Sequence, residues 1–400
     1  MQSMRPLAGI KVVEIGTMVT APLAAMLLAQ MGADVIKVEN PAGGDPFRRA
    51  TSGGYSPNFI AYNQNKRSIQ LDLASGSGRA ELLELVADAD ILIENFRPGV
   101  MDRLGLTREV LNAVNPALVY CSITGFGADG PYAERPAYDT VGIALSGILH
   151  MYLDRDQPDV RGPTLADNVT GLYAVGGVLA ALHARRRTGE GQRVEINMLE
   201  SAIAFAPDAF AYLSQRGEAY GPHSRVASSQ SFVWKCADGG MIAIHLSVPE
   251  KFWLGLLDAL GARDSLGRDP RFLTAELRIA NYQLLSAELA AVGITRSRDE
   301  WAALLRAHDV PFAPVNSIGE VLDDPQVRHL GTFAEVDHVL AGKVVGIRNP
   351  LRINGERSSV QAPPTLGEHA GARFGADRDA VKPATRTVRE GYCGQPDTKG

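Results

Sequence analysis

The stretch that decides the fold reads Ile10-Lys11-Val12-Val13-Glu14-Ile15 and, after a run rich in Ala, Leu and Met, Asp34-Val35-Ile36-Lys37-Val38-Glu39. Each β-branched run is typical of a buried strand. Pro22 suits the first turn of the helix between them, and Gly32 suits its end. Strand, helix and strand joined by short connections form a βαβ unit, which builds a parallel sheet through a right-handed crossover. This segment therefore predicts an α/β fold.

The same alternation of strand and helix patterns continues to residue 124. Strands are predicted at 68–73, 90–95 and 118–124, and helices at 78–89 and 108–114. Repeated units of this kind predict a Rossmann-like, doubly wound parallel sheet with helices on both faces.

Two further helices, at 139–151 and 166–187, and a strand at 193–198 are expected next. The helix at 166–187 is rich in small residues, and four of them share helical spacing: Gly171, Ala174, Gly177 and Ala181. Small side chains on one helix face predict close packing of the backbone against a neighbour.

Composition and the pattern of predicted elements divide the chain into four segments. Residues 1–215 are expected to form a large domain, and residues 216–324, with a hairpin pattern at 232–244, a smaller α+β domain. Residues 325–381 are expected to return to the large domain. Residues 382–400 are rich in Pro, Gly, Thr and charges, which is typical of a flexible tail.

Composition excludes several classes of protein. The chain is 45% hydrophobic and 21% charged with a net charge of -5, and its mixed charges argue against a nucleic-acid surface. It has no apolar run long enough to span a membrane, and residues 1–9 do not resemble a signal peptide. Cys121, Cys236 and Cys393 form no CxxC pair, so we expect a cytoplasmic protein without a structural metal site.

A dinucleotide-binding site is a natural hypothesis for the first βαβ unit. Glu39 follows Gly16 at a spacing close to that of a ribose-binding acid, and the start of the helix would favour phosphate. The turn reads Gly16-Thr17-Met18-Val19-Thr20-Ala21-Pro22, however, and lacks GxGxxG. The glycines that let a pyrophosphate approach the backbone are missing, so we do not expect NAD or FAD.

Asp167 is the candidate catalytic residue. It lies at the start of the helix predicted at 166–187, in the run Thr164-Leu165-Ala166-Asp167-Asn168. An aspartate there can simply stabilise the helix dipole, which is the more common reason for its presence. It can also be a nucleophile, because a helix N-terminus is expected to favour the ionised carboxylate that a nucleophile needs.

The surroundings of Asp167 carry a resemblance to a known family. They include Arg185-Arg186-Arg187-Thr188-Gly189-Glu190-Gly191-Gln192, and Glu94-Asn95-Phe96-Arg97-Pro98-Gly99 stands upstream. Other matching segments are residues 6–14, 32–39, 65–73, 125–127, 135–139, 235–239 and 309–315. Together they resemble the class III CoA-transferase family, also called the CaiB/BaiF or formyl-CoA transferase-like family.

The resemblance implies a fold and an activity. It implies a large Rossmann-like domain with a small domain, in a homodimer whose subunits interlock like rings. It implies transfer of coenzyme A from an acyl-CoA to a small carboxylic acid, with no tightly bound cofactor. Asp167 would attack the thioester to give a mixed anhydride, and CoA thiolate would then convert the anhydride to an aspartyl-CoA thioester.

The resemblance also implies contacts with coenzyme A, which is a substrate here. Arg97 and Arg103 would bind the nucleotide phosphates, because guanidinium groups suit phosphate oxygens. Arg48 or Arg49 is an alternative to Asn40, which stands where some relatives carry Arg. The full set of expected contacts is Asn40, Leu71 and Asp72 near the nucleotide, Asn95, Phe96, Arg97 and Arg103 in one stretch, and Tyr138 and Asp139 on the pantetheine side.

Two departures from the family pattern bear on substrate choice. Residues 225–231 lack the glycines with which oxalate-using relatives cover the site, so oxalate is not expected. Ile143 stands where many members have Gln. His223 and Arg225 lie in the same covering segment and could meet an acceptor carboxylate, although a histidine in a polar loop is more often merely exposed.

The sequence also bears on two other functions. A racemase similar to α-methylacyl-CoA racemase would need a His-Asp pair, but this chain has Tyr138 where that His falls, and tyrosine is a weak base near neutral pH. A catalytically silent CoA-binding protein is the third reading, against which the presence of Asp167 speaks.

Overall fold

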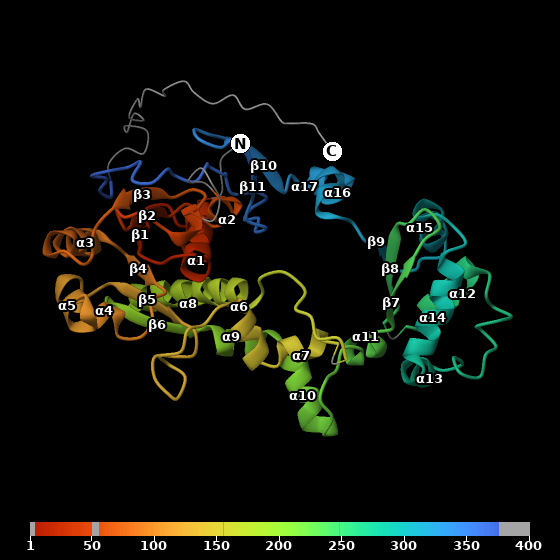
Figure 1. Cartoon of the computed structure of the whole chain (residues 1–400). Helices are drawn as coiled ribbons and strands as arrows, with labels where there is room; N and C mark the ends of the chain where they lie inside the picture. Colours follow the sequence, from red (N-terminus) through yellow and green to blue (C-terminus); the bar gives the residue numbers. More distant parts are fainter. Residues whose placement is uncertain (1–4, 50–55, 155, 248, 376–400) are drawn as a thin grey trace, which may run out of the picture. The chain divides into compact units, whose positions relative to one another are not determined.

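The computed structural model describes residues 5–49, 56–154, 156–247 and 249–375, and the chain divides into two units (Figure 1). Unit 1 contains Met1–Thr124, Gly171–Ile196 and Ala334–Gly400, and unit 2 contains Gly125–Thr170 and Asn197–Phe333. The tail expected at 382–400 lies outside the described residues.

Unit 1 is built on a six-stranded sheet. Its strands are β1 (Lys11–Glu14), β2 (Asp34–Glu39), β3 (Arg67–Gln70), β4 (Ile91–Glu94), β5 (Val119–Thr124) and β6 (Gln192–Asn197). Their order is β3-β2-β1-β4-β5-β6, and the sheet is parallel. This is the order of a doubly wound sheet, in which the direction of winding reverses between β1 and β4. The predicted α/β fold is confirmed.

Helices cover both faces of the sheet. They are α1 (Thr20–Gln30), α2 (Pro57–Tyr62), α3 (Gly76–Asp88), α4 (Val100–Arg103), α5 (Arg108–Val114) and α8 (Ala166–Thr188), with a 3-10 turn η1 (Pro46–Arg49). Side chains of α1 and α8 share one core with Val12 and Val35, whereas α3 and α5 share another with Val13 and Ile36. Alternate residues of each strand therefore enter opposite cores. A two-stranded sheet of β10 (Phe333–His338) and β11 (Gly342–Ile347) follows later in the chain.

The small residues of α8 pack as predicted. A Cβ at Gly171 would lie 2.9 Å from Leu23 of α1, and one at Gly177 would lie 2.7 Å from Val194 of β6. Ala174 is fully buried in the core beside α1. The missing side chains let α8 approach both the sheet and its neighbouring helix.

Unit 2 has its own core around a three-stranded sheet. The strands β7 (Ser231–Lys235), β8 (Met241–His245) and β9 (Phe312–Pro314) pair antiparallel, as the hairpin pattern predicted for the first two. Trp234, Trp253 and Trp301 are buried there. Its helices are α6 (Asp139–Leu145), α7 (Ile148–Tyr152), α9 (Met198–Phe205), α10 (Pro207–Arg216), α11 (Ser224–Ser228), α12 (Glu250–Leu260), α13 (Ala275–Ala280), α14 (Tyr282–Gly293), α15 (Arg298–Ala307), α16 (Ile318–Asp323) and α17 (Pro325–Leu330).

One expected element is wrong. The single helix predicted at 139–151 is two helices, α6 and α7, that meet at Gly147. Gly147 has φ +85°, a left-handed conformation that glycine adopts without strain and that ends a right-handed helix. In addition, no helix among the described residues is long and apolar enough to cross a membrane.

The start of α3 offers a matched test of packing. A Cβ at Gly78 would lie 2.1 Å from the carbonyl oxygen of Asp72, whereas one at Gly76, in the same helix, meets nothing within 4 Å. Gly78→Ala should therefore lower the free energy of unfolding by about 1–3 kcal/mol. Gly76→Ala should leave it unchanged or raise it by up to about 1 kcal/mol, because alanine restricts the unfolded chain. Urea unfolding measures both, and equal effects would contradict the packing described.

Candidate active site

The expected nucleotide contacts of unit 1 lie at one edge of the sheet. Asn40 follows the last residue of β2, Leu71 follows β3, and Asn95 follows β4. The parallel register pairs Glu39 with Gln70, so these strands end side by side. Ligands of doubly wound sheets bind at this carboxyl edge, where the winding direction reverses. The sequence-based set thus falls on the edge that the fold makes suitable for a ligand.

Asn95 fastens the loop between β1 and α1. Its amide oxygen accepts the backbone N–H of Thr17 at 2.9 Å, and its amide nitrogen donates to the Thr17 carbonyl at 2.8 Å and the Thr20 hydroxyl at 2.9 Å. Gly16 is required beside it, because a Cβ there would lie 2.3 Å from that of Ala21. The side chain of Asn95 therefore ties β4 to the loop after β1, across the point where the winding reverses.

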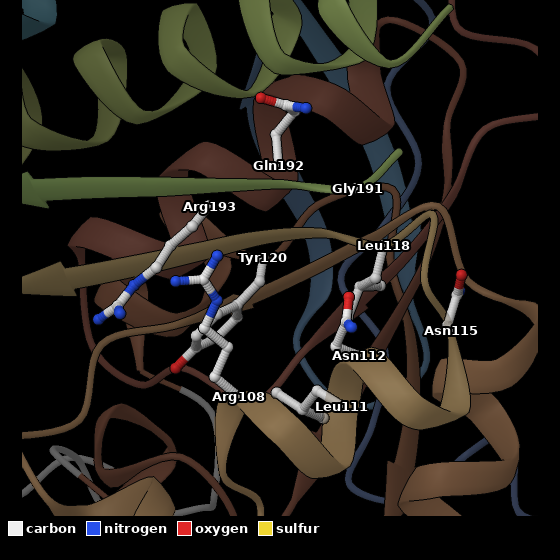
Figure 2. Close-up of a pocket in the computed structure, with 9 residues that line it drawn as sticks. All are labelled: Arg108, Leu111, Asn112, Asn115, Leu118, Tyr120, Gly191, Gln192 and Arg193. Atoms are coloured by element: carbon white, nitrogen blue, oxygen red, sulfur yellow. The ribbon is translucent and has the colours of Figure 1, made fainter. Parts of the chain in front are cut away.

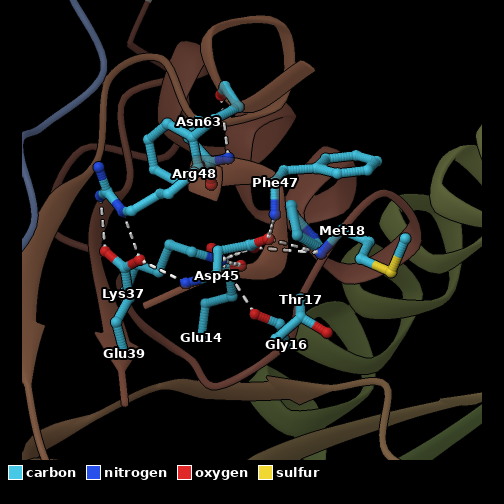
Figure 3. Close-up of polar contacts among 12 residues, drawn as sticks. Glu14, Gly16, Thr17, Met18, Lys37, Glu39, Asp45, Phe47, Arg48 and Asn63 are labelled. Carbon is cyan, nitrogen blue, oxygen red and sulfur yellow. Dashed lines mark hydrogen bonds and ion pairs between the residues drawn. The ribbon is translucent and has the colours of Figure 1, made fainter. Parts of the chain in front are cut away.

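The same loop is also held by the buried carboxylate of Asp45 (Figure 3). Met18 has φ +65°, which a side chain disfavours, and its N–H donates to both oxygens of Asp45 at 3.2 and 3.1 Å. The amine of Lys37 lies 3.0 Å from Asp45 and 2.7 Å from Glu14, and it donates to the carbonyl of Gly16 at 2.9 Å. Ion pairs in the core thus fix the backbone of residues 16–18.

A second lysine completes this ion network, which we define as Glu14, Lys37, Asp45 and Lys66. Lys66 lies 2.7 Å from Glu14 and donates to the side chain of Asn63 at 2.8 Å. Burial lowers the pKa of Lys66 to about 8 even though Glu14 raises it. For Lys37, the charges of Glu14 and Asp45 outweigh burial and raise the pKa.

Glu39 is not free for a ribose, and Arg48 is not free for a phosphate. Two nitrogens of Arg48 lie 2.7 Å from the carboxylate oxygens of Glu39, and Ser68 donates to Glu39 at 2.6 Å. Both charged side chains are buried. Despite burial, the hydrogen bonds from Arg48 and the charge of Lys37 lower the pKa of Glu39. The expectation that Arg48 could replace Asn40 at a phosphate is therefore wrong, because the arginine is used inside the core.

The remaining expected nucleotide contacts of unit 1 differ in exposure. Leu71 is buried, and Phe96 is half-buried with its N–H donating to Glu94 at 2.7 Å. Four polar members are exposed and accessible to a ligand: Asn40, Asp72, Arg97 and Arg103. The side chains of Asn40 and Asp72 accept local backbone N–H groups and shape their turns.

Asp167 lies in the first turn of α8, and a second carboxylate lies against that turn. One oxygen of Asp139, in the first turn of α6, accepts the backbone N–H of Leu165 at 2.7 Å and that of Asp167 at 3.2 Å. The first N–H groups of a helix have no partner within it, so Asp139 supplies one from a neighbouring helix. Sequence reasoning identified Asp139 but not this bond.

The charge state of Asp167 differs from the expectation. Burial, and then the charge of Asp139, raise the pKa of Asp167 to about 7. The expected stabilisation of the ionised form by the helix N-terminus is overcome, because the side chain is partly removed from water and faces a like charge. A carboxyl with a strongly raised pKa in such a pair is a candidate functional group.

Other side chains singled out in unit 2 are placed as follows. Tyr138 is 60% exposed, and Ile143 is buried in a core cluster with Ala166. His223 and Arg225 are exposed at a short helix, α11, where a loop was expected. No group of three His, Cys, Asp or Glu side chains among the described residues could hold a metal ion.

The buried ion network was missed by sequence reasoning. The available signal was a charged residue inside a β-branched strand, as in Val35-Ile36-Lys37-Val38, which must find a partner if the strand is buried. Its partners stand at distant positions, so the pairing itself could not be read from the chain.

Comparison with known proteins decides the family. The model of CoA-transferase family III matches residues 7–370. The chain belongs to CoA-transferase family III. Succinyl-CoA:glutarate CoA-transferase of Mus musculus is 32% identical over 379 residues, which cover 92% of this chain and 85% of the relative. Formyl-CoA:oxalate CoA-transferase of Escherichia coli O157:H7 is 32% identical over 393 residues, covering 92% and 94%.

A solved structure agrees with this assignment. The CAIB/BAIF family protein from Brucella suis has a TM-score of 0.82 with 34% identity, over 92% of this chain and 98% of that one. The resemblance read from the motifs is confirmed, and this family III member is an enzyme of the CoA-transferase class.

The raised pKa of Asp167 predicts a pH-dependent cost in stability. Between the ordinary pKa of 3.8 and about 7, the folded protein binds more protons at Asp167 than the unfolded chain, so stability falls as pH rises through this window. Asp167→Asn removes this loss. At pH 8 it should be more stable than the wild type by roughly 1–2 kcal/mol, allowing for partial exposure, and the gain should vanish near pH 4.

Urea unfolding at several pH values measures the difference. Asp299→Asn is the matched control, because Asp299 also lies in the first turn of a helix, α15, but is exposed. A gain for Asp167→Asn that does not change with pH would contradict the stated charge state.

Proposed function

We propose that this enzyme moves coenzyme A from an acyl-CoA to a carboxylic acid, with Asp167 as the nucleophile. The observation that carries the proposal is the placement of Asp167: a partly buried carboxyl at the start of α8, beside Asp139, in a chain of CoA-transferase family III. A carboxylate suits this chemistry because it can be acylated and remade with little net change in free energy.

The proposed reaction proceeds through two anhydrides and an aspartyl-CoA thioester. The Asp167 carboxylate attacks the thioester carbon, the C–S bond breaks, and CoA thiolate leaves a mixed anhydride. The thiolate then attacks the aspartyl carbonyl, which releases the donor acid and forms an aspartyl-CoA thioester. The acceptor carboxylate displaces the thiolate to form a second anhydride, and thiolate attack on the acceptor carbonyl yields the new acyl-CoA and restores Asp167. Water must be excluded, because an anhydride hydrolyses.

We propose that the carboxyl edge of the sheet in unit 1 takes the nucleotide. Arg97 and Arg103 are exposed beside the turn at Pro98 and Gly99, and they would bind phosphate oxygens. Leu71 and Asp72 would border the adenine, with Asn40 nearby. Asn95 and Phe96 would shape this edge through the loop that Asn95 fastens.

Tyr138 and Asp139 would lie toward the pantetheine. Asp139 would act there through the backbone it binds at the start of α8. The two named relatives act on succinyl-CoA with glutarate and on formyl-CoA with oxalate. We propose small carboxylic acids other than oxalate for this chain, because residues 225–231 have no glycine.

We further propose a homodimer with interlocked subunits. Apolar side chains of α9 and α10 are exposed, namely Phe205, Phe210 and Leu213, and a partner subunit would cover them. Interlocked subunits cannot separate without unfolding, so sedimentation at nanomolar concentration should show a folded dimer. A folded monomer there would refute the proposal.

Transfer should depend on Asp167. Asp167→Ala should lower kcat by at least about a thousandfold, since no other group can form the anhydride, whereas Asp299→Ala should retain wild-type activity. In the wild type, kcat/KM should rise with pH, reach half of its maximum near pH 7 and level off about one pH unit higher, because only the ionised carboxyl attacks. Steady-state kinetics with a panel of acyl-CoA donors and acids measures both. Activity above a tenth of wild type in Asp167→Ala would refute the assignment.

Arg103 should serve the nucleotide and not the acyl group. Arg103→Ala should raise KM by roughly tenfold to a hundredfold for every acyl-CoA, with kcat nearly unchanged, because a phosphate contact is equal in ground and transition states. The effect should disappear with an acyl-pantetheine, which lacks the nucleotide. A changed preference among acyl groups, or an equal loss with acyl-pantetheine, would contradict this role.

A further inference from the structure

A small pocket lies along β5 and β6, on the face of the sheet that α5 covers (Figure 2). Its accessible volume is about 40 Å³, and its lining includes Arg108, Asn112, Tyr120, Gln192 and Arg193. Side chains of α5 and the start of β5 belong to the core shared with α3, whereas α1 and α8 pack on the other face. The pocket is therefore separated by the sheet from the helix that carries Asp167.

Two guanidinium groups, those of Arg108 and Arg193, line this pocket. In Figure 2, the side chains of Arg108 and Arg193 lie on the same side, close to the ring of Tyr120. One nitrogen of Arg193 lies 2.7 Å from exposed Glu195, and Arg108 forms no ion pair with any residue that the structure describes. Two positive groups, Arg108 and Arg193, thus share one carboxylate, that of Glu195, so the site keeps a net positive charge. A pair of guanidinium groups suits the oxygens of a carboxylate or a phosphate.

Two further acids lie near these arginines. Glu94 lies behind Tyr120, whose hydroxyl donates to it at 3.0 Å, and burial raises the pKa of Glu94 although the charge of Arg193 lowers it. The carboxylate of Glu109, next to Arg108, accepts hydrogen bonds from its own backbone N–H and from the hydroxyl of Thr107. It also interacts electrostatically with Arg108. The floor of the pocket is thus the aromatic ring and hydroxyl of Tyr120.

We propose that this pocket binds a small oxyanion, a short carboxylate or inorganic phosphate, between Arg108 and Arg193. A volume of about 40 Å³ exceeds the roughly 10–15 Å³ that one water needs, yet it is far smaller than a drug-sized ligand requires. The amide group of Asn112 supplies a further polar contact at the rim.

The pocket is joined to the proposed nucleotide edge by two hydrogen bonds. Tyr120 donates to one oxygen of Glu94, and the other oxygen of Glu94 accepts the backbone N–H of Phe96 at 2.7 Å. Phe96 precedes Arg97 in the stretch that we assign to coenzyme A. The anion site is thus structurally connected to that stretch without being part of it.

Calorimetric titration of the full chain with inorganic phosphate, and separately with acetate, tests the site. We expect a dissociation constant in the millimolar range for at least one of them. Arg108→Gln and Arg193→Gln should each weaken binding by roughly tenfold, because each removes charge-assisted hydrogen bonds. Arg268→Gln is the matched control, since Arg268 is exposed and paired with Asp264 far from this pocket in sequence, and it should change binding less than twofold.

Three outcomes would overturn the proposal. Neither anion binds, or binding is unchanged in both pocket variants with native circular dichroism, or saturating free CoA abolishes it, which would make the pocket part of the nucleotide site. Binding that persists with CoA and falls in both pocket variants supports it. The measurement involves no acyl transfer, so it is independent of whether Asp167 is the nucleophile.

Discussion

The ligand-binding edge of unit 1 depends on the ion pairs of Lys37. Its amine lies 2.7 Å from Glu14 and 3.0 Å from Asp45, and none of the three is exposed to solvent. Two carboxylates cannot both stay charged in a dry interior without a cation between them, and removal of one partner from such a group typically costs about 3–5 kcal/mol. Asp45 also accepts the N–H of Met18. The same ion pairs therefore stabilise the core and hold Met18 in its left-handed backbone conformation. Position and stability at this edge therefore come from the same bonds.

The acids of the ion network and the proposed nucleophile differ in their partners. In unit 1, Glu14, Glu39 and Asp45 each contact a cation at 3.0 Å or less. In unit 2, Asp139 and Asp167 lie together, and neither forms an ion pair with a residue that the structure describes. A pair of carboxyls without a cation lowers stability, and proteins keep such arrangements mainly where chemistry needs them. This arrangement supports the proposal that the reaction takes place at Asp167.

Local patterns were enough to predict the sheet and its helices. The β-branched runs predicted β1 and β2 within one residue at each end, and the spacing of small residues predicted how α8 packs. Contacts between distant residues could not be predicted in this way. Arg48 was expected as an alternative phosphate contact because nothing near it in the sequence reveals Glu39 as its partner. Likewise, the direction of the Asp167 pKa shift was missed because both of its causes come from the fold: the burial of the side chain, and the approach of Asp139, which stands 28 residues away in the sequence.

The hydrogen bonds that Asp139 accepts at the start of α8 affect the basicity of the neighbouring Asp167 carboxylate. A helix N-terminus normally stabilises a nearby anion through its unpaired N–H groups, which lowers the basicity of the carboxylate. Here Asp139 takes up the N–H groups of Leu165 and Asp167, so the carboxyl of Asp167 receives less of that stabilisation and faces a negative neighbour instead. A more basic carboxylate is a better nucleophile toward a thioester, provided that enough of it is ionised. If Asp167 is the nucleophile, as we propose, a pKa of about 7 would meet both conditions near neutral pH, because roughly half of the groups would then be charged.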